Sequence, residues 1–356
     1  MRGDEPGQEE MFSYGSLEQR VPEDHPLRRI HTLTEAALKP LRGRLEDLYS
    51  DVGRPSVPPE RLLRAMLLQI LFSIRSERAL MDQIELHLGF RWFVGLSMSE
   101  PVWDASTFSK NRDRLLGGDV AREFLESVLH QARQRRWLSD ERFSVDGTLI
   151  QAWASEASYQ PKQDPPEPGQ GSGRRGELQQ RDLKESKTDP EANLFKKNGN
   201  DRARLSYLGH VLSDMRQGLI AAACVTRATT KAEREAAVEM VRELRHRKRQ
   251  IRVAADKAYD EVDFVRQMRS LRATPQVTQY TGQRSSAIDG RTTRHPTYAW
   301  AQQGRRRIER IFAWLKQVAG QRRTRFRGRE RVDWMFTFAA AAYNLVRMAK
   351  LSATTA

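Results

Sequence analysis

The stretch RFSVDGTLI, residues 142–150, is where the pattern of the chain changes from helical to extended. Residues with high strand propensity stand on both sides of Asp146-Gly147, a dipeptide that is first of all a turn signal. The stretch therefore predicts β-structure around a turn. It opens a second part of the chain, whose pattern differs from that of the residues before it.

The residues after this stretch alternate between strand and helix patterns. Strand character at 205–212 and 218–226, with a short polar link between them, predicts a hairpin. The remaining expected elements are a helix at about 230–247, a strand at 250–255, a helix at 260–271 and a short strand near 275–280. This order favours an α/β fold of the ribonuclease-H-like kind, with a mixed sheet flanked by helices.

The residues before this stretch, 26–140, show the apolar spacing of helices throughout. Pro58-Pro59 opens a helix whose apolar face continues to residue 74, because proline costs least in a first turn. Further helices are expected at 76–88, at 106–115 with Asp104 or Ser106 as cap, and at 119–136. The segment TFSKNR, residues 107–112, fits a helix-turn-helix that reads DNA, and an ordinary helical bundle explains it equally well.

These patterns divide the chain into three parts. We expect a flexible N-terminal segment at 1–25, a helical domain at 26–140 and an α/β domain at 141–350. Within the last part, residues of about 156–201 are polar and rich in proline, which predicts a mobile insertion. A final helix at 332–348 has an apolar face that closes the core.

Charge favours nucleic acid as the partner. The chain carries 61 Lys and Arg against 46 Asp and Glu, a net charge of +15, which attracts phosphate backbones. A solvated basic surface with no partner is the plain alternative. The most apolar stretch, 62–74, is too short to span a membrane, and the polar start has no secretory signal. The single cysteine, Cys224, lies in an apolar run, so a reducing cytoplasm is expected.

Three acids stand where such a sheet would bring them together. Asp146 lies in the first strand, and Asp256 directly follows the strand at 250–255, at the end where open sheets place ligands. Glu309 belongs to RRRIERIFAWLK, residues 305–316. On a continuous helix Arg305 and Lys316 fall within roughly 40° of Glu309, so one face carries an acid between two bases. Each aspartate taken alone is explained as a turn or cap residue.

A basic segment, RRTRFRGRER, follows at residues 322–331. Its single aromatic residue, Phe326, makes no stacking platform, so a solvated run of charge is the alternative to DNA binding. We expect the segment to follow a DNA backbone, with contacts from Arg322, Arg323, Arg325 and Arg327.

The motifs resemble those of DDE transposases, specifically the IS-five group of bacterial insertion sequences within the IS-four-like superfamily. VDGT at 145–148 and ADKAY at 255–259 resemble the first two acidic motifs, although Ala258 stands where the family usually has glycine. Arg305, Glu309 and Lys316 match the third motif, Tyr-x2-Arg-x3-Glu-x6-Lys. Its tyrosine falls on Gln302, and Tyr298 lies one helical turn earlier. Residues 60–115 resemble the helical InsH-type N-terminal domain that accompanies the group.

The resemblance implies a transposase that cleaves and joins DNA with two Mg2+ ions, or Mn2+ in their place. Asp146, Asp256 and Glu309 would hold the ions, and Arg305 and Lys316 would hold the phosphate or flanking strand. The implied partners are double-stranded DNA, as terminal inverted repeats and target, and a second copy in a homodimer. The implied location is the bacterial cytoplasm, at the nucleoid. A nuclease that only hydrolyses DNA and a noncatalytic DNA-binding regulator are the alternatives.

One choice within the second motif is made on local grounds. Asp256 follows an apolar strand, whereas Asp260 stands where the next helix begins. We therefore expect Asp256 to be the metal ligand and Asp260 to cap the helix by accepting the N–H of Val262 or Asp263.

Overall fold

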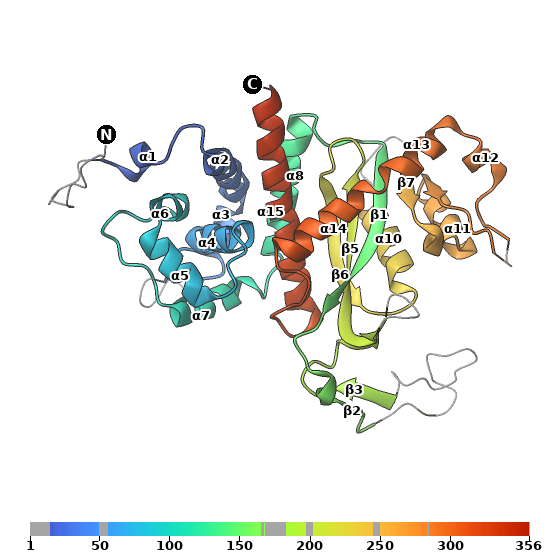
Figure 1. The fold of residues 1–356 in the computed structure, drawn as a ribbon, viewed down its shortest axis with the longest axis horizontal. Helices are drawn as coiled ribbons and strands as arrows, with labels where there is room; N and C mark the ends of the chain where they lie inside the picture. The colour runs from blue at the N-terminus through green and yellow to red at the C-terminus, as the bar shows by residue number, and fades with distance from the viewer. Residues whose placement is uncertain are drawn as a thin grey trace, which may run out of the picture.

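A computed structural model gives the fold and describes residues 15–49, 56–164, 167, 183–196, 202–244, 250–282 and 285–355 (Figure 1). Helices gather at the N-terminal side, and a mixed sheet with helices on both faces forms the rest (Figure 1). The expected α/β architecture, a ribonuclease-H-like sheet after an all-helical region, is confirmed.

The N-terminal helices begin and end close to the predicted positions. Ser76 and Asp104 accept N–H groups of the first turns of α5 and α7, and Pro59 opens α4. The bounds are α1 Leu17–Arg20, α2 Pro26–Leu38, α3 Arg42–Glu46, α4 Pro59–Leu71, α5 Glu77–Leu86, α6 Leu88–Val94, α7 Ala105–Leu115 and α8 Val120–Gln134.

The central sheet has the order β4-β5-β1-β7-β8, with β6 also paired to β5. Strand β5 pairs antiparallel with β1 and β6, whereas β7 runs parallel to β1 and β8. The predicted hairpin is therefore the β5–β6 pair. The bounds are β1 Arg142–Gln151, β4 Asn193–Phe195, β5 Arg204–Asp214, β6 Ile220–Arg227, β7 Ile251–Ala255 and β8 Ala273–Val277.

Helices cover the two faces of the sheet. A Cβ on Gly147 would meet Glu233 of α10, and a Cβ on Gly209 would meet Phe336 of α15. Gly209 pairs with Thr148, the neighbour of Gly147, so α10 and α15 lie on opposite faces. The remaining helices are α10 Ala232–Glu243, α11 Val262–Ser270, α12 Gly290–Thr293, α13 Pro296–Gly304, α14 Arg307–Gln317 and α15 Arg329–Thr355.

Helix α15 joins the two parts of the chain. It packs against β6 on one side and against α8 and α2 on the other (Figure 1). Phe124 of α8 and Trp334 of α15 both contact the ring of Phe338, with centroids 5.4 and 5.0 Å apart. A single apolar core therefore runs from the helical region into the sheet.

Two local expectations differ from the structure. Strand β1 passes straight through Asp146-Gly147, because both residues pair with β5, so there is no turn at this dipeptide. Within the segment expected to be flexible, α1 forms and buries Leu17. Residues 1–14 lie outside the described residues.

The polar insertion is also partly ordered. A two-stranded sheet joins β2, Tyr159–Pro161, to β3, Lys184–Ser186. Strand β4 adds to the edge of the central sheet, and buried Asp189 accepts a hydrogen bond from Tyr207 at 2.6 Å. The rest of the segment that was predicted to be mobile, residues 165–166, 168–182 and 197–201, lies outside the described residues.

Candidate active site

Asp146 lies in the middle of β1, with its side chain partly exposed. Its Oδ1 accepts the N–H of Gly147 at 2.7 Å. Side chains alternate along a strand, so Asp146 shares a face with Thr148, which pairs with Gly209 on the side covered by α15. Asp146 therefore belongs to the face that carries α15 and not to the face of α10.

Asp256 directly follows β7, as the sequence predicted. The parallel register ends with the pair of Ser144 and Ala254, and Asp146 and Asp256 each follow that pair by two residues. Ala254 packs against Ala301 of α13, and Asp256 is extended, so it keeps to the same face. Its Oδ1 accepts the N–H of Ala258 at 2.8 Å. Asp146 within β1 and Asp256 just beyond the end of β7 therefore lie on the side of α13, and both carboxylates act on Tyr259.

Glu309 lies in the first turn of α14, which packs against β1. Ile308 and Ile311 bury the inner face of the helix, and the side chain of Glu309 is exposed. Among the described residues, no three acidic, histidine or cysteine side chains gather closely enough to hold a metal ion. The structure thus brings the two aspartates together and sets Glu309 on the adjoining helix, outside ligand distance of a common centre.

The third motif does not lie on one continuous helix. Arg305 and Arg306 form a turn between α13 and α14, so the expected common face of Arg305, Glu309 and Lys316 is interrupted. The N–H of Glu309 still donates to the carbonyl of Arg306 at 3.2 Å. Lys316 ends α14 and is partly buried.

Gln302 and Tyr298 share one structural role. Gln302 donates to the carbonyl of Gln276 at 2.7 Å and accepts from Thr278 at 2.6 Å. Tyr298 donates to the carbonyl of Val277 at 2.9 Å. Both side chains fasten α13 to the end of β8. Gln302 also accepts from Nε of Arg305 at 3.2 Å, which orients that guanidinium.

The basic segment is held against the end of β1. The N–H of Gln151 donates to the carbonyl of Arg322 at 3.1 Å, and the N–H of Thr324 donates to the carbonyl of Gln151 at 2.9 Å. The guanidinium of Arg323 lies 5.7 Å from the ring centre of Trp153, and Arg322 and Arg327 are exposed. The backbone of the segment is thus fixed by the sheet, with arginine side chains at the surface.

The same segment touches the helical region. Arg325 donates to the carbonyl of Arg75 at 2.5 Å, and Arg112 of α7 lies over the ring of Phe326 at 5.1 Å. Desolvation, with Arg112 nearby, lowers the pKa of Arg325. The ring of Phe326 therefore contacts Arg112 within the protein.

Most of the segment TFSKNR of α7 contacts other parts of the protein, and Lys110 is its exposed residue. Phe108 and Asn111 are buried, and Ser109 and Arg112 both contact Glu77 of α5. Side chains that make such contacts within the protein are not available to enter a DNA groove. The contacts therefore favour the helical bundle over the helix-turn-helix interpretation.

Asp260 does not cap a helix, which corrects the sequence prediction. It is 1% exposed, and its two oxygens accept the N–H groups of Tyr280 at 2.7 Å and Ala287 at 2.8 Å. Helix α11 begins after Glu261 without a side-chain cap. Asp260 thus fixes the loop after β8 and is shielded from solvent.

Sequence reasoning missed two residues near the aspartates. Tyr259 is fully buried, and its hydroxyl has no hydrogen-bond partner among the described residues. Burial, with the nearby carboxylates of Glu233, Asp146 and Asp256, raises the pKa of Tyr259. Glu233 lies against Gly147 on the opposite face of β1 from Asp146. Nothing in the local pattern distinguished Glu233 from an ordinary first-turn acid.

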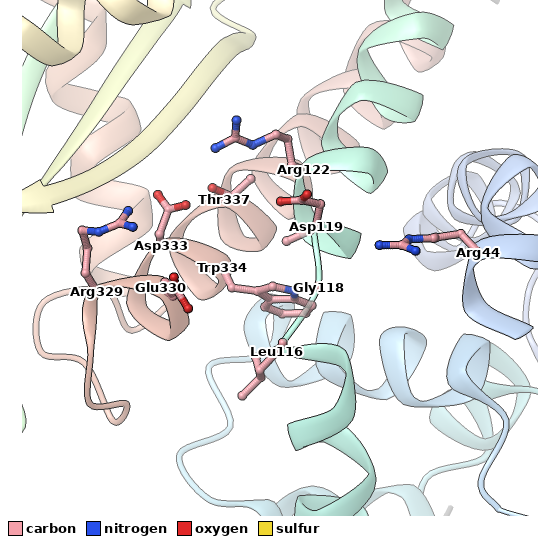
Figure 2. A pocket seen from close by; sticks show the side chains of 12 residues that line it. Arg44, Leu116, Gly118, Asp119, Arg122, Arg329, Glu330, Asp333, Trp334 and Thr337 are labelled. Atoms are coloured by element: carbon pink, nitrogen blue, oxygen red, sulfur yellow. The ribbon is translucent and has the colours of Figure 1, made fainter. Parts of the chain in front are cut away.

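Figure 2 shows a separate pocket where the start of α8, the first turns of α15 and Arg44 of α3 meet. Its charged lining consists of Arg44, Asp119, Arg122, Arg329, Glu330 and Asp333. Asp333 accepts the N–H of Val225 at 2.6 Å, and burial raises its pKa. Arginines and carboxylates balance here, and none of the three motif acids lines the pocket. The lining of this pocket therefore does not indicate metal binding or DNA cleavage.

Comparison with known proteins gives two family matches. Residues 137–345 match the family described as transposase DDE domain, and residues 15–114 match the transposase domain DUF772. No curated protein matches the chain. No helix in the described ranges has the length and apolar character needed to cross a membrane.

Solved structures with some similarity are also transposases. A piggyBac transposase synaptic complex with hairpin DNA is 9% identical, with a TM-score of 0.43 over 96% of this chain and 78% of that chain. A pre-cleavage Mos1 transpososome is 12% identical, with a TM-score of 0.21 over 94% of this chain and 98% of that chain.

Proposed function

The chain belongs to the DDE transposase family, and on this premise we propose that Asp146, Asp256 and Glu309 are the acids with which it cleaves DNA. The match covers more than half of the chain, which establishes membership, and a DDE transposase is an enzyme that binds and cleaves DNA. The choice of acids is supported above all by one observation. Asp146 in β1 and Asp256 directly after the neighbouring strand β7 lie on the same side of the sheet, and α14 with Glu309 packs against β1.

DDE transposases use divalent metal ions, and the donor set suits them. Carboxylate oxygens are the ligands that Mg2+ and Mn2+ prefer. Asp146 and Asp256 provide a neighbouring pair, and the exposed side chain of Glu309 has the rotamer freedom to turn toward them. Two such ions, when bound, activate a water or a 3′-hydroxyl and stabilise the leaving oxygen.

The remaining motif residues act on the phosphates. Arg305, oriented by Gln302, presents a planar fork suited to a phosphodiester, and Lys316 provides a point charge at the far end of α14. Arg322, Arg323, Arg325 and Arg327 form a basic edge beside the end of β1. We propose that DNA runs along this edge, so that a phosphodiester reaches the two aspartates.

The finer assignments rest on the motifs. The third motif, with Arg305, Glu309 and Lys316, supports the IS-five group, and the helical region at 26–140 supports an InsH-type DNA-binding domain ahead of a catalytic domain at 141–350. On the same basis we propose terminal inverted repeats and target DNA as substrates, a homodimer as the active form, and the nucleoid as the place of action.

A strand-transfer assay with a labelled transposon-end duplex and Mg2+ tests the proposal. We expect joined products from the wild type and none from Asp256→Asn. Asp263→Asn is the matched control, because Asp263 is an exposed acid of α11. Nicked products without joining would identify a hydrolytic nuclease, and bound but uncut DNA would identify a regulator.

A further inference from the structure

A second basic groove lies at the end of the sheet where β1 begins. It is formed by the C-terminal end of α8, the start of β1, the β5–β6 turn and α13, which meet along one rim of the molecule (Figure 1). We call it the Trp300 groove. The side chains that matter are Arg133, Arg136, Arg142, Arg216 and Trp300.

The charge of the groove is positive. Its lining contains these four arginines and two carboxylates, those of Asp140 and Glu141. None of these arginines forms a salt bridge with a described residue, although Arg216 donates to the carbonyl of Arg136. Arginines that keep their charge unpaired in a groove are suited to phosphates.

The backbone also holds an unusual conformation here. Arg136 has a φ of 56°, in the left-handed region, which is strained for a residue with a Cβ. This residue follows the C-cap of α8, and the N–H of Trp137 next to it donates to the carbonyl of Ala132 at 2.9 Å. The chain thus turns sharply at the rim of the groove, and Arg136 stays on its lining.

Trp300 gives the groove an aromatic surface. It is 40% exposed, although its neighbour Ala301 is fully buried. The guanidinium of Arg142 lies over its ring at 4.8 Å from the centroid, which fixes the indole in place. A large aromatic ring at the surface of a basic groove is the combination that binds unpaired nucleotides, because each base has a face that stacks.

The groove is joined firmly to the candidate active site. Arg307, two residues before Glu309, donates to the carbonyl of Met215 in the β5–β6 turn at 2.9 Å. Met215 packs with Ala254 and Ala301, on the face of β7 that also carries Asp256. DNA bound in the groove therefore lies next to the start of α14.

We propose that the Trp300 groove binds an unpaired stretch of the DNA strand adjoining the phosphate that is cleaved. The arginines contact its phosphates, and Trp300 stacks on one base. An unpaired stretch is required because bases inside a duplex already stack on both sides. This inference rests on the proposed function, since it assumes that the three acids act on DNA.

Equilibrium binding without divalent metal tests the groove by itself. The probes are a blunt duplex and the same duplex with a short single-stranded tail carrying 2-aminopurine. For Trp300→Ala we expect about tenfold weaker binding of the tailed duplex and less than about twofold change for the blunt one. Trp300→Phe keeps a stacking ring, so it retains most of the affinity and of the 2-aminopurine quenching.

The arginines have a matched control. Arg142→Ala is expected to reduce the salt dependence for the tailed duplex by about one unit of log–log slope. Arg291→Ala, which changes an arginine 90% exposed outside the groove, leaves binding as it is. If Trp300→Ala binds both DNAs as tightly as the wild type, and the wild type cleaves DNA, the proposed role of the groove is wrong and the proposed function stands. Wild-type protein that binds neither DNA would overturn the proposed function as well.

Discussion

Asp260 accepts the backbone N–H of Tyr280 at 2.7 Å from a position that solvent hardly reaches, and its second oxygen accepts from Ala287. Asp256, four residues earlier, stays partly exposed at the end of β7 beside Asp146. The two acids of the second motif therefore have different roles. Asp260 holds the loop after β8, and the side chain of Asp256 is accessible to a ligand.

The two asparagine variants should fail in different ways. Asp256→Asn removes the charge of a proposed metal ligand, so we expect loss of metal-dependent cleavage with little change in stability. Asp260→Asn replaces one acceptor by an N–H2 group that faces a backbone N–H. We expect this variant to lose about 1–3 kcal/mol of stability and to cleave DNA while folded. Cleavage should be measured with thermal unfolding, at temperatures of equal folded fraction. An active Asp256→Asn beside an inactive, folded Asp260→Asn would reverse the assignment.

DNA affinity should fall steeply with salt. Between residues 303 and 331 there are eleven Lys and Arg against two acids, and each phosphate they neutralise releases counterions. For the double variant Arg322→Ala/Arg327→Ala, which changes two exposed arginines, we expect the log–log slope to shrink by about 2. Titrations at several salt concentrations measure it. A slope near zero for the wild type would contradict an electrostatic interface.

Much of the fold was predictable because it depends on local periodicity. The apolar run in 62–74, the cap at Asp104 and the strand before Asp256 each gave an element close to its observed bounds. The turn predicted at Asp146-Gly147 was wrong because both residues pair with β5, and long-range strand pairing overrides a local turn signal.

The site was predictable only in part, for the same physical reason. The motifs pointed to three acids, and the register of β1 and β7 is consistent with the pairing of two of them. The role of Asp260 depends on Tyr280 and Ala287, twenty and twenty-seven residues away. The place of Glu233 depends on packing across the sheet at Gly147. Neither contact can be predicted from the residues next to Asp260 or Glu233 in the sequence.

Cys224 should be inert and dispensable. Burial raises the pKa of its thiol to about 12, so at pH 8 almost none is thiolate, the reactive form. We expect very slow reaction of the native protein with a thiol reagent at pH 8, fast reaction after unfolding, and full cleavage activity for Cys224→Ser. The raised pKa also means that the contribution of the thiol to stability is present below its usual pKa near 9 and is lost as the pH rises through 12. Rapid labelling of the folded protein would show that the thiol is accessible.

Gly209 keeps β1, β5 and α15 together, and a methyl group there should be costly. It pairs with Thr148, two residues from Asp146, and its added Cβ would lie 2.8 Å from Ile150 Cδ1 and from two ring atoms of Phe336. Phe336 is fully buried in the core, so its ring cannot move away freely. For Gly209→Ala we expect a loss of about 1–3 kcal/mol of stability, measured by urea unfolding.

Two further variants test the cause of that loss. Gly43 lies in α3 with no atom within 4 Å of an added Cβ, so Gly43→Ala should cost nothing. Phe336→Leu removes the ring atoms that crowd Gly209, so in combination with Gly209→Ala it should destabilise by less than the sum of the two single changes. Additive losses would mean that the ring of Phe336 is not what excludes a side chain at residue 209. The cost would then come from Ile150 or from the β5 backbone itself.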